Sequence, residues 1–446
     1  MREMKDSGVE WIGEIPIDWK TARIKQLFTF GKGLPITKDN LVENGVSVIS
    51  YGQIHSKSND GIHIQDDLIR YVDKAFLTTN SKSLVKKGDF IFADTSEDID
   101  GCGNCIYIDR DLLLFAGYHT IIFSAEQKGD NRYLGYLFKT DAWRSQIRKQ
   151  VTGVKLFSIS RRILSDVSVI MPQETGERIR IADYLDDKCA KINSIIEKQQ
   201  VIIEKLKEYK LSVINEALTH GLEETRNYKE SGIDWIGKIP EHWSIQKLKT
   251  IVDILPGYAF SSNDFATDEG IPLLRGINVV PSGIRWNDVV FWNQEVPKYL
   301  EPYYLQENDI VVGLDRPWIS DGMRTTIMNK DSLPCLLLQR VCRIRLKKEC
   351  AYDHRLIYHW INSKAFESAL SIETTGVSVP HISTKQIENF IIALPPNEEA
   401  RSICDYLHVK TCEIDKSISI RSQLIGKLLD YKKSLIYEVV TGKREV

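Results

Sequence analysis

Two long stretches of the chain repeat apolar side chains in alternating steps of four and three residues, at 173–221 and 397–446. This seven-residue period is typical of helices that pack along a narrow apolar seam, as in a coiled coil. Prolines precede both stretches and a glycine lies at the end of each, which are helix start and stop signals. We predict that the two helices pair with each other. The alternative is that each packs on its own globular domain. The predicted seam residues are Leu185, Ile192, Ile196, Ile203, Leu206, Val213, Leu407, Ile414, Ile418, Ile425, Leu428 and Leu435.

The chain is a tandem duplication. Residues 5–19, KDSGVEWIGEIPIDW, and residues 229–243, KESGIDWIGKIPEHW, are identical at nine of fifteen positions. The tripeptide Asp-Tyr-Leu recurs at 183–185 and 405–407, whereas residues 55–150 and 279–373 share little. An internal repeat organises a whole fold. Matched ends around unlike middles predict one scaffold that carries two different readers.

Each variable middle alternates short apolar runs with Gly, Asn, Asp and Pro. This pattern predicts short strands and turns, with helices near residues 133–150 and 353–370, and therefore an α+β domain in each half. The predicted boundaries are 1–172 for the first domain and 173–221 for the first helix. The second domain, with its linker, takes 222–396, and the second helix takes 397–446.

Charge is balanced over the whole chain, with 59 Lys and Arg against 61 Asp and Glu among 446 residues, a net charge of −2. Proteins that bind nucleic acid usually carry a basic excess, so the total argues against DNA. The local charge differs from the total. Residues 141–162 hold six bases and one acid, and residues 340–348 hold five bases and no acid. The basic runs lie in the candidate domains, so the neutral total does not exclude DNA.

The composition also bears on compartment and metal content. Apolar runs fall far below the roughly 18 residues of a membrane helix, and the N-terminal residues are charged. We expect a cytoplasmic protein that does not enter a membrane. Of eight cysteines, only Cys102 and Cys105 form a CxxC, without further ligands at zinc spacing. We expect reduced cysteines and no metal site.

The motif S-G-[IV]-[DE]-W-I-G-x-I-P-x-x-W, at residues 7–19 and 231–243, resembles the start of each half of a type I restriction–modification specificity subunit. Repeated Thr-Gly-Val, Ile-Ser and Asp-Tyr-Leu segments are similar to the same family, and the resemblance covers essentially the whole chain. It implies an α+β fold with two target-recognition domains in tandem pseudo-repeat. These domains would be separated by two long helices that form an antiparallel coiled coil.

The resemblance also implies function and partners. Each recognition domain would read one half of a bipartite, asymmetric site on double-stranded DNA, and the coiled coil would set the spacing. The subunit would be non-catalytic and would hold no cofactor. It would recruit two methyltransferase subunits and two motor–nuclease subunits. S-adenosylmethionine, ATP and Mg²⁺ are expected on those partners.

The catalytic motifs of such systems are missing from this sequence. The Pro-Pro at 395–396 stands at a domain–helix junction and is not followed by the aromatic residue of an adenine methyltransferase loop. Gly33 in the sequence Gly-Lys-Gly predicts a turn, and no GxxxxGK[ST] phosphate loop is present. The acidic residues between Asp89 and Asp100 are expected to form a solvated loop. We therefore expect no catalytic residue.

Candidate DNA contacts follow from side-chain chemistry. Gln and Asn pair bidentately with adenine and Arg with guanine, and loops on a rigid scaffold commonly carry such contacts. The segment from Val341 to Leu346 alternates apolar and basic residues, which on a strand would place its arginines on an open face. The Thr-Gly-Val loops, with Ser378 and His381 near the second, are expected to contact the DNA backbone or to brace the domains. The candidates are Gln53, Tyr118, His119, Lys155, Arg161, Arg275, Asn278, Gln339, Arg340, Arg343, Arg345 and Lys385.

Two other hypotheses remain open. The chain could be a scaffold that uses two unlike domains to bind protein partners and does not read DNA. It could also be a DNA-modifying enzyme with an unrecognised active site. The missing catalytic motifs count against the enzyme. The unlike middles count against the scaffold, because identical partners would favour similar docking surfaces.

Overall fold

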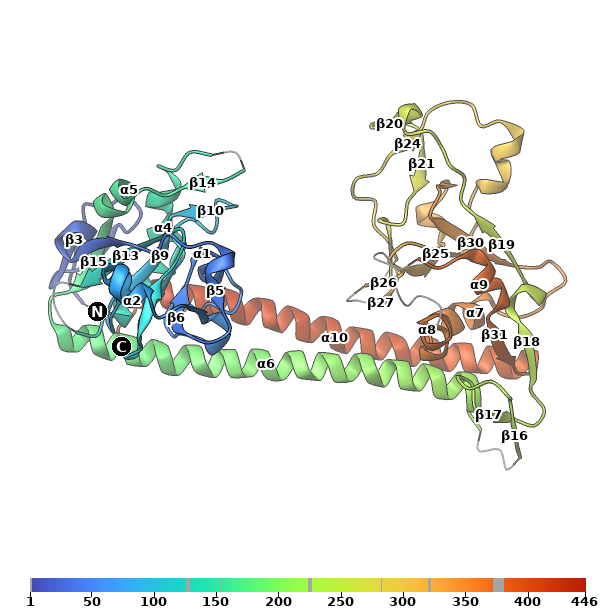
Figure 1. Cartoon of the computed structure of the whole chain (residues 1–446). Coiled ribbons are helices and arrows are strands. Elements are labelled where there is room, and N and C mark those ends of the chain that lie inside the picture. Colours follow the sequence, from blue (N-terminus) through green and yellow to red (C-terminus); the bar gives the residue numbers. More distant parts are fainter. Residues whose placement is uncertain are drawn as a thin grey trace. The chain divides into compact units, whose positions relative to one another are not determined.

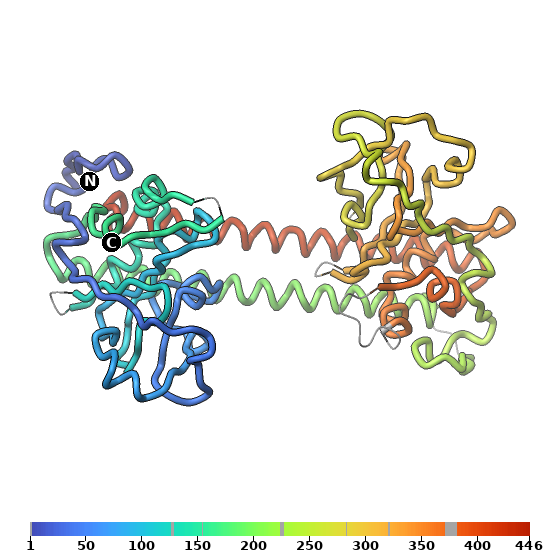
Figure 2. Tube along the Cα trace, turned by 45° about the horizontal axis from the view of Figure 1, so that its top comes forward, coloured from blue at the N-terminus to red at the C-terminus, as the bar shows by residue number. Residues whose placement is uncertain are grey.

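The computed structural model describes residues 2–125, 129–153, 155–223, 227–281, 283–319, 322–371 and 381–446. The chain divides into two compact units, Met1–Gln199 with Gln423–Val446, and Gln200–Ser422. Each unit holds one α+β domain together with part of both long helices, α6 (Thr175–His220) and α10 (Asn397–Val440) (Figure 1). The N-terminal and C-terminal ends of the chain both belong to the first unit (Figure 2).

Two sheets form the first domain. An antiparallel sheet has the strand order β11 (Cys105–Tyr107), β9 (Phe90–Ala93), β13 (Thr120–Ala125) and β4 (Phe28–Lys32). A mixed sheet has the order β5 (Leu41–Val42), β7 (Arg70–Val72), β6 (Val46–Ile49), β12 (Leu114–Ala116) and β8 (Leu84–Val85). Strands β6 and β12 are parallel to each other.

Short elements complete the first domain. The cap motif forms the hairpin β1 (Met4–Asp6) and β2 (Glu14–Pro16), and β3 (Trp19–Arg23) pairs with β15 (Ser168–Pro172). Strand β10 (Thr95–Ser96) pairs with β14 (Phe157–Ser158). The short helices are α1 (Tyr51–Ile54), α2 (Phe76–Thr79), α3 (Arg132–Phe138), α4 (Asp141–Arg148) and α5 (Arg161–Asp166).

The alternating side chains of β9 explain how the layers pack. Phe90 and Phe92 point into a core shared with α3, α4 and the long helices, whereas Ile91 and Ala93 pack toward β6 and β12. Because successive strand side chains point to opposite faces, one fully apolar strand is buried from both sides. Asp89, which precedes β9, is also buried, and its carboxylate accepts from the backbone N–H of Lys86 at 2.9 Å. The expectation of a solvated acidic loop was therefore wrong at Asp89.

The second domain repeats this strand order, without a counterpart of β8 in its mixed sheet, although its sequence differs. Its antiparallel sheet runs β19 (Val252–Pro256), β30 (Val341–Leu346), β25 (Ile310–Gly313) and β28 (Thr325–Ile327). Its mixed sheet runs β20 (Phe265–Ala266), β24 (Phe291–Trp292), β21 (Ile271–Leu274) and β29 (Leu336–Leu337), with β21 parallel to β29. The unlike middles predicted from sequence therefore share one topology.

Some of the remaining elements of the second domain have counterparts in the first. Strands β16 (Tyr228–Glu230) and β17 (Lys238–Pro240) form the repeated cap hairpin, and β18 (Ser244–Lys247) pairs with β31 (Ile391–Leu394). Two small hairpins are additional, β22 (Val279–Val280) with β23 (Gly283–Ile284) and β26 (Trp318–Ile319) with β27 (Gly322–Met323). The short helices are α7 (His354–Ile361), α8 (Lys364–Ser371) and α9 (Thr384–Asn389).

The long helices run antiparallel within each unit. In the first unit Lys432 Nζ donates to Asn193 Oδ1 at 2.7 Å. In the second unit Lys210 Nζ donates to Asp415 Oδ2 at 2.7 Å. The predicted pairing is confirmed, and all twelve predicted seam residues are buried or half-buried. The ends of the helices also join the cores of the domains, so part of the alternative holds as well.

The repeated cap motif joins each domain to both helices. Trp19 Nε1–H donates to Glu177 Oε1 at 3.2 Å, and Trp243 Nε1–H donates to Glu399 Oε1 at 3.1 Å. Each glutamate stands in the first turn of a long helix. The other helix ends beside the same tryptophan. A Cβ at Gly442 would lie 3.3 Å from Trp19, and one at Gly221 would lie 3.2 Å from Trp243. Both glycines adopt positive φ, the conformation that commonly terminates a helix.

An arginine clamp, which the sequence analysis missed, reinforces each junction. Arg132 on α3 contacts Asp130 and two carboxylates of α6, Asp183 and Asp186. In the second domain Arg355 on α7 contacts Asp353 at 2.6 Å and, on α10, Asp405 at 2.8 Å. The repeated Asp-Tyr-Leu tripeptides supply Asp183 and Asp405, so this part of the duplication preserves an ion pair.

Candidate nucleic-acid interface

Each domain presents a short loop between the parallel strand of its mixed sheet and the central strand of its antiparallel sheet. In the first domain the loop connects β12 to β13 and ends at His119, and in the second it connects β29 to β30 and ends at Arg340. Both residues have positive φ, 53° for His119 and 68° for Arg340. Few non-glycine residues occupy this region, and it commonly marks a functional position. Tyr118-His119 and Gln339-Arg340 therefore occupy equivalent positions in the two domains.

The backbone fixes both loops in the same way. The N–H of Asp94 donates to the carbonyl of His119 at 3.1 Å, and the N–H of Leu314 donates to the carbonyl of Arg340 at 2.9 Å. Asp94 and Leu314 are the residues that directly follow β9 and β25. Each loop residue is thus tied to the end of a buried strand, which gives its side chain a rigid base.

In the first domain the loop carries aromatic and imidazole groups. The ring of His119 lies 4.0 Å from that of Tyr118 and 5.6 Å from that of Tyr51, measured between centroids. His119 Nδ1 lies 2.8 Å from Asp94 Oδ1 and 3.4 Å from Thr95 Oγ1. The Tyr118 residue is 42% exposed. This surface offers ring faces for stacking and a single imidazole edge for hydrogen bonding.

In the second domain the equivalent loop carries a guanidinium group. Arg340 Nη1 donates to Asp315 Oδ2, and His381 Nδ1 lies 2.6 Å from the other carboxylate oxygen. Partial burial alone would raise the pKa of Asp315, but the contacts from His381 and Arg340 lower it below its ordinary value. The Arg340 side chain remains 71% exposed. An ionised carboxylate therefore holds a solvent-facing arginine.

Two predicted base-reading residues instead cap turns. Gln53 Oε1 accepts from the N–H of Ser50 at 3.0 Å, and Asn278 Oδ1 accepts from the N–H of Arg275 at 3.1 Å. The Asn278 amide nitrogen donates to two backbone carbonyls, and the residue is 0% exposed. The prediction for Asn278 was wrong, because a buried amide with these partners cannot reach a base. Gln53 is half-buried and its oxygen is engaged.

The predicted open basic face of β30 was also wrong. The second sheet covers that face, where Val341 packs into a core with Leu274 and Leu337. Arg343 is 5% exposed and is paired with Asp253. The Arg345 guanidinium contacts the buried Asp309 carboxylate at 2.5 and 2.6 Å. These arginines brace the sheet.

The remaining candidates lie at or near the domain surface. Gln339, Lys155, Arg161 and Lys385 are exposed, and Arg275 is half-buried beside the Arg340 loop. The Arg161 guanidinium lies over the ring of Phe30, 4.9 Å from its centroid. The second Thr-Gly-Val segment and Ser378 lie outside the described residues, as does Val154 of the first segment.

Sequence reasoning missed two arginines and one carboxylate of the second domain. Arg324 Nη1 donates to the carbonyl of Gly276 at 2.8 Å, beside Arg275, and Arg316 is exposed immediately after Asp315. Asp315, which accepts a hydrogen bond from Arg340, was not among the candidates. An acid two residues after a buried strand, followed in sequence by an arginine, was the available signal.

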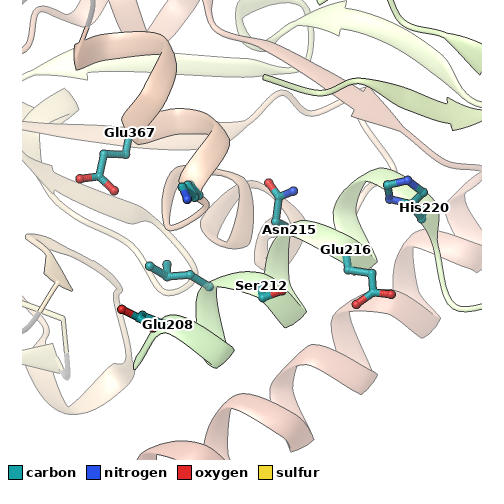
Figure 3. A pocket seen from close by; sticks show the side chains of 8 residues that line it. Glu208, Ser212, Asn215, Glu216, His220 and Glu367 are labelled. Carbon is teal, nitrogen blue, oxygen red and sulfur yellow. The ribbon is translucent and has the colours of Figure 1, made fainter. Parts of the chain in front are cut away.

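A cavity of about 480 Å³ in the second unit lies apart from these loops. Side chains from the end of α6 and from α8 line it, and Figure 3 shows Glu208, Glu216 and Glu367 at its wall. It belongs to the helix–domain junction, so it does not enlarge the candidate interface. Among the described residues, no group of three or more His, Cys, Asp and Glu side chains is placed to hold a metal ion.

The cysteines have a structural setting. All eight are free, and both members of the CxxC are buried. Burial raises the pKa of the Cys105 thiol to about 12. A thiol with so high a pKa is protonated at neutral pH and is a poor nucleophile and metal ligand. No helix in the described ranges is long and apolar enough to cross a membrane.

Comparison with known proteins identifies the scaffold. The family model described as "Type I restriction modification DNA specificity domain" matches residues 16–216 and 240–424, once in each half. The chain belongs to the type I restriction–modification DNA specificity family. Its two domains are therefore the target-recognition domains of that family.

Individual relatives agree with this assignment. The specificity subunit of the type I restriction enzyme MjaVIII from Methanocaldococcus jannaschii is 27% identical over 97% of this chain and 94% of its own length. The EcoAI specificity subunit from Escherichia coli is 37% identical over 39% of this chain and 30% of its own length. A solved chain from a study of assembly and conformational transition in a type I restriction–modification system shares the fold. Its TM-score is 0.69 at 14% identity, with 96% of this chain and 99% of that chain covered.

Proposed function

We propose that this chain is the non-catalytic DNA-reading subunit of a type I restriction–modification complex. Each recognition domain reads one half of a bipartite, asymmetric site on double-stranded DNA, and the two helices set the spacing. The observation that carries the proposal is the pair of equivalent loops, one with Tyr118 and His119 and the other with Gln339 and Arg340. One scaffold that presents unlike hydrogen-bonding groups at the same position fits two different half-sites.

The chemistry is assigned to the partner subunits. We place S-adenosylmethionine on two methyltransferase subunits, and ATP and Mg²⁺ on two motor–nuclease subunits, with the complex in the cytoplasm. Two copies of one partner require two similar docking surfaces. Tyr209 and Tyr431 occupy equivalent positions on α6 and α10 and are 55% and 50% exposed. Large aromatic side chains are enriched at protein interfaces, so their presence in both copies supports a repeated docking surface.

The docking assignment is tested by measuring stoichiometry. Y209A and Y431A should each remove one methyltransferase subunit from the reconstituted complex, and the double variant should remove both, as measured by native mass spectrometry. Y228A, an exposed tyrosine in the cap hairpin, is the control and should leave two subunits bound. Two subunits retained in the double variant would contradict this surface.

The reading function is tested by exchanging a domain. We reconstitute the chain with its cognate methyltransferase subunits and sequence the methylated genomic DNA. Replacing residues 20–170 with those of a relative of different specificity should change one half of the methylated motif and leave the other half and the gap intact. Methylation that is unchanged after the exchange would contradict DNA reading and favour the scaffold hypothesis.

The spacing role has a separate test. Removing one heptad, about 10 Å of rise, from each of α6 and α10 within their paired stretches should shorten the gap between the half-sites. Removing a heptad keeps the apolar seam in phase, so the helices should still pair. A complex that still methylates DNA with an unaltered gap would exclude the helices as the element that sets spacing.

A further inference from the structure

The inference concerns which base the second recognition domain selects, and it rests on the proposed DNA-reading function. Arg340 combines three features: positive φ, a side chain that is 71% exposed, and a hydrogen bond to Asp315. A non-glycine residue in this region costs about 1 kcal/mol or more of conformational energy. Its backbone carbonyl and side chain are both held, so the strained conformation is maintained by specific contacts.

The carboxylate at the base of the loop determines what the arginine can do. Asp315 accepts from Arg340 Nη1, and the second carboxylate oxygen lies 2.6 Å from His381 Nδ1. Asp315 is therefore fixed from two sides and restricts rotation of the guanidinium. A guanidinium carries five N–H donors, so several remain for another partner after one contact with Asp315. A charged, oriented group with two parallel donors matches the O6 and N7 acceptors of guanine.

The first recognition domain provides the contrast. His119 has the same backbone conformation but contacts Asp94. Asp94 is the first residue after β9, whereas Asp315 is the second residue after the equivalent strand β25. An imidazole cannot present two parallel donors to one base edge. The two equivalent loops therefore recognise different chemistry, and only the loop of the second domain carries the forked donor of a guanine contact.

We propose that Arg340 reads a guanine in the half-site of the second recognition domain, and that Asp315, held by His381, is the positioning residue that orients Arg340. A guanine contact predicts loss of one base preference, whereas a backbone contact predicts uniform weakening at every site.

The test is the methylated motif of the reconstituted complex, read genome-wide for the unaltered chain and for R340Q and R340K. The unaltered chain should require a guanine at one or more positions of the second half-site. Both variants should lower the preference for one of these guanines by about tenfold to a hundredfold, with the first half-site and the gap unchanged. R340K keeps the charge but loses the fork, so it separates base reading from phosphate attraction.

Further variants control for misfolding and examine the positioning residue. R340G fits positive φ, so it supplies a folded chain without the side chain should R340Q fail to assemble. D315N should weaken the same guanine preference while leaving the rest of the motif intact, and D94N should leave that preference unchanged. An unaltered motif in both R340Q and R340K, or a uniform loss of methylation with the motif intact, would overturn the inference. A chain that gives no bipartite motif at all would instead remove the proposed function on which it rests.

Discussion

At the helix junctions the two halves of the chain use the same contacts, and at the loops that face solvent they do not. Each junction pairs a cap tryptophan with a first-turn glutamate, through Trp19 and Glu177 in one half and Trp243 and Glu399 in the other. Each loop instead has its own chemistry, with His119 in one half and Arg340 in the other.

The difference shows which parts of a duplicated chain tolerate change. A junction side chain contacts the domain and a long helix at once, so a substitution there must satisfy several neighbours. A loop side chain contacts an acid and other residues near the loop but neither long helix, so its identity can change while the strand order stays the same. Sequence divergence between the halves is therefore concentrated at loop positions, where a side chain has few contacts that the fold depends on.

The largest expected effect comes from the glycines that support the loops. A Cβ at Gly257 would lie 1.9 Å from the carbonyl oxygen of Leu338, and one at Gly33 would lie 2.0 Å from that of Gly117. G257A must displace the Arg340 loop, because the obstacle is backbone rather than a mobile side chain. We expect a loss of about 3 kcal/mol or more in the free energy of unfolding, near the upper end of the usual cost of overpacking. Denaturant unfolding measures it.

A matched glycine provides the control for this prediction. Gly52 lies in α1 and would meet nothing within 4 Å, so G52A should leave the stability unchanged or raise it slightly. G33A should behave like G257A but in the other half. If G257A unfolds at the same denaturant concentration as the unaltered chain, the loop is not held as tightly as the structure indicates.

The arginine clamps should give the next largest effect. Arg132 forms ion pairs with three carboxylates and its side chain is 22% exposed, whereas Arg355 forms ion pairs with two and its side chain is 28% exposed. Removing the cation leaves partly buried acids without a partner. We therefore expect R132M to lower the free energy of unfolding by about 2–4 kcal/mol and R355M to lower it by less. Hydrogen exchange followed by mass spectrometry can assign each loss to its own unit. Equal losses would show that the third carboxylate of the first clamp contributes little.

The sequence predicted the regular parts of this fold well. Heptad spacing identified both long helices and their seam, because a period of seven is a strong signal over more than forty residues. The duplicated motifs predicted a shared scaffold, and in the structure they form its helix–domain junctions. Strand-level predictions were weaker, since alternation in residues 341–346 indicates two faces but does not show that a second sheet covers one of them. Arg343 was therefore assigned to DNA although it is buried, and Asn278, chosen for its amide chemistry, is buried as well.

Contacts that depend on distant pairs could not be derived from sequence. Asp315 and Arg340 are 25 residues apart, and their pairing depends on the register of β25 with β30. Gly33 was predicted to form a turn, but its role is a close approach to the carbonyl of Gly117. A single sequence carries the residue types of such contacts but not the strand register that brings them together.

Acid should destabilise the second unit more than the first. Burial lowers the pKa of His359 on α7 to about 3, from an ordinary value of 6.5, whereas the equivalent Tyr136 donates to Asp186 at 2.5 Å. Between these two pKa values the unfolded chain binds a proton that the folded chain does not, so stability falls as the pH drops below about 6.5. The loss should be about 1.4 kcal/mol at pH 5.5 relative to neutral pH.

Comparing H359F with the unaltered chain isolates the contribution of His359 to the loss of stability in acid. The variant keeps an aromatic side chain of similar size but has no proton to gain, so it should lose less stability between pH 7.5 and pH 5.5. Unit-resolved hydrogen exchange at both pH values is the measurement, and the first unit is the internal reference. A second unit that weakens equally with and without His359 would assign the acid sensitivity to other groups.

The smallest expected effect concerns the polar contacts along the helix pair, where the two units again differ. Lys210 pairs with a carboxylate, Asp415, and Lys432 donates to an uncharged amide, Asn193. Both partners in the first of these contacts are solvent-accessible, so a double-mutant cycle with K210M and D415N should give a coupling of only about 0.2–1 kcal/mol. That coupling should shrink in 1 M salt, because screening weakens an exposed ion pair, whereas the Lys432–Asn193 coupling should persist.

Polar seam residues with so little stabilising effect are better explained as setting the register of the helices, since any shift would separate them from their partners. If the Lys210–Asp415 coupling does not decrease with salt, the contact behaves as a neutral hydrogen bond and the distinction between the two units disappears at this position.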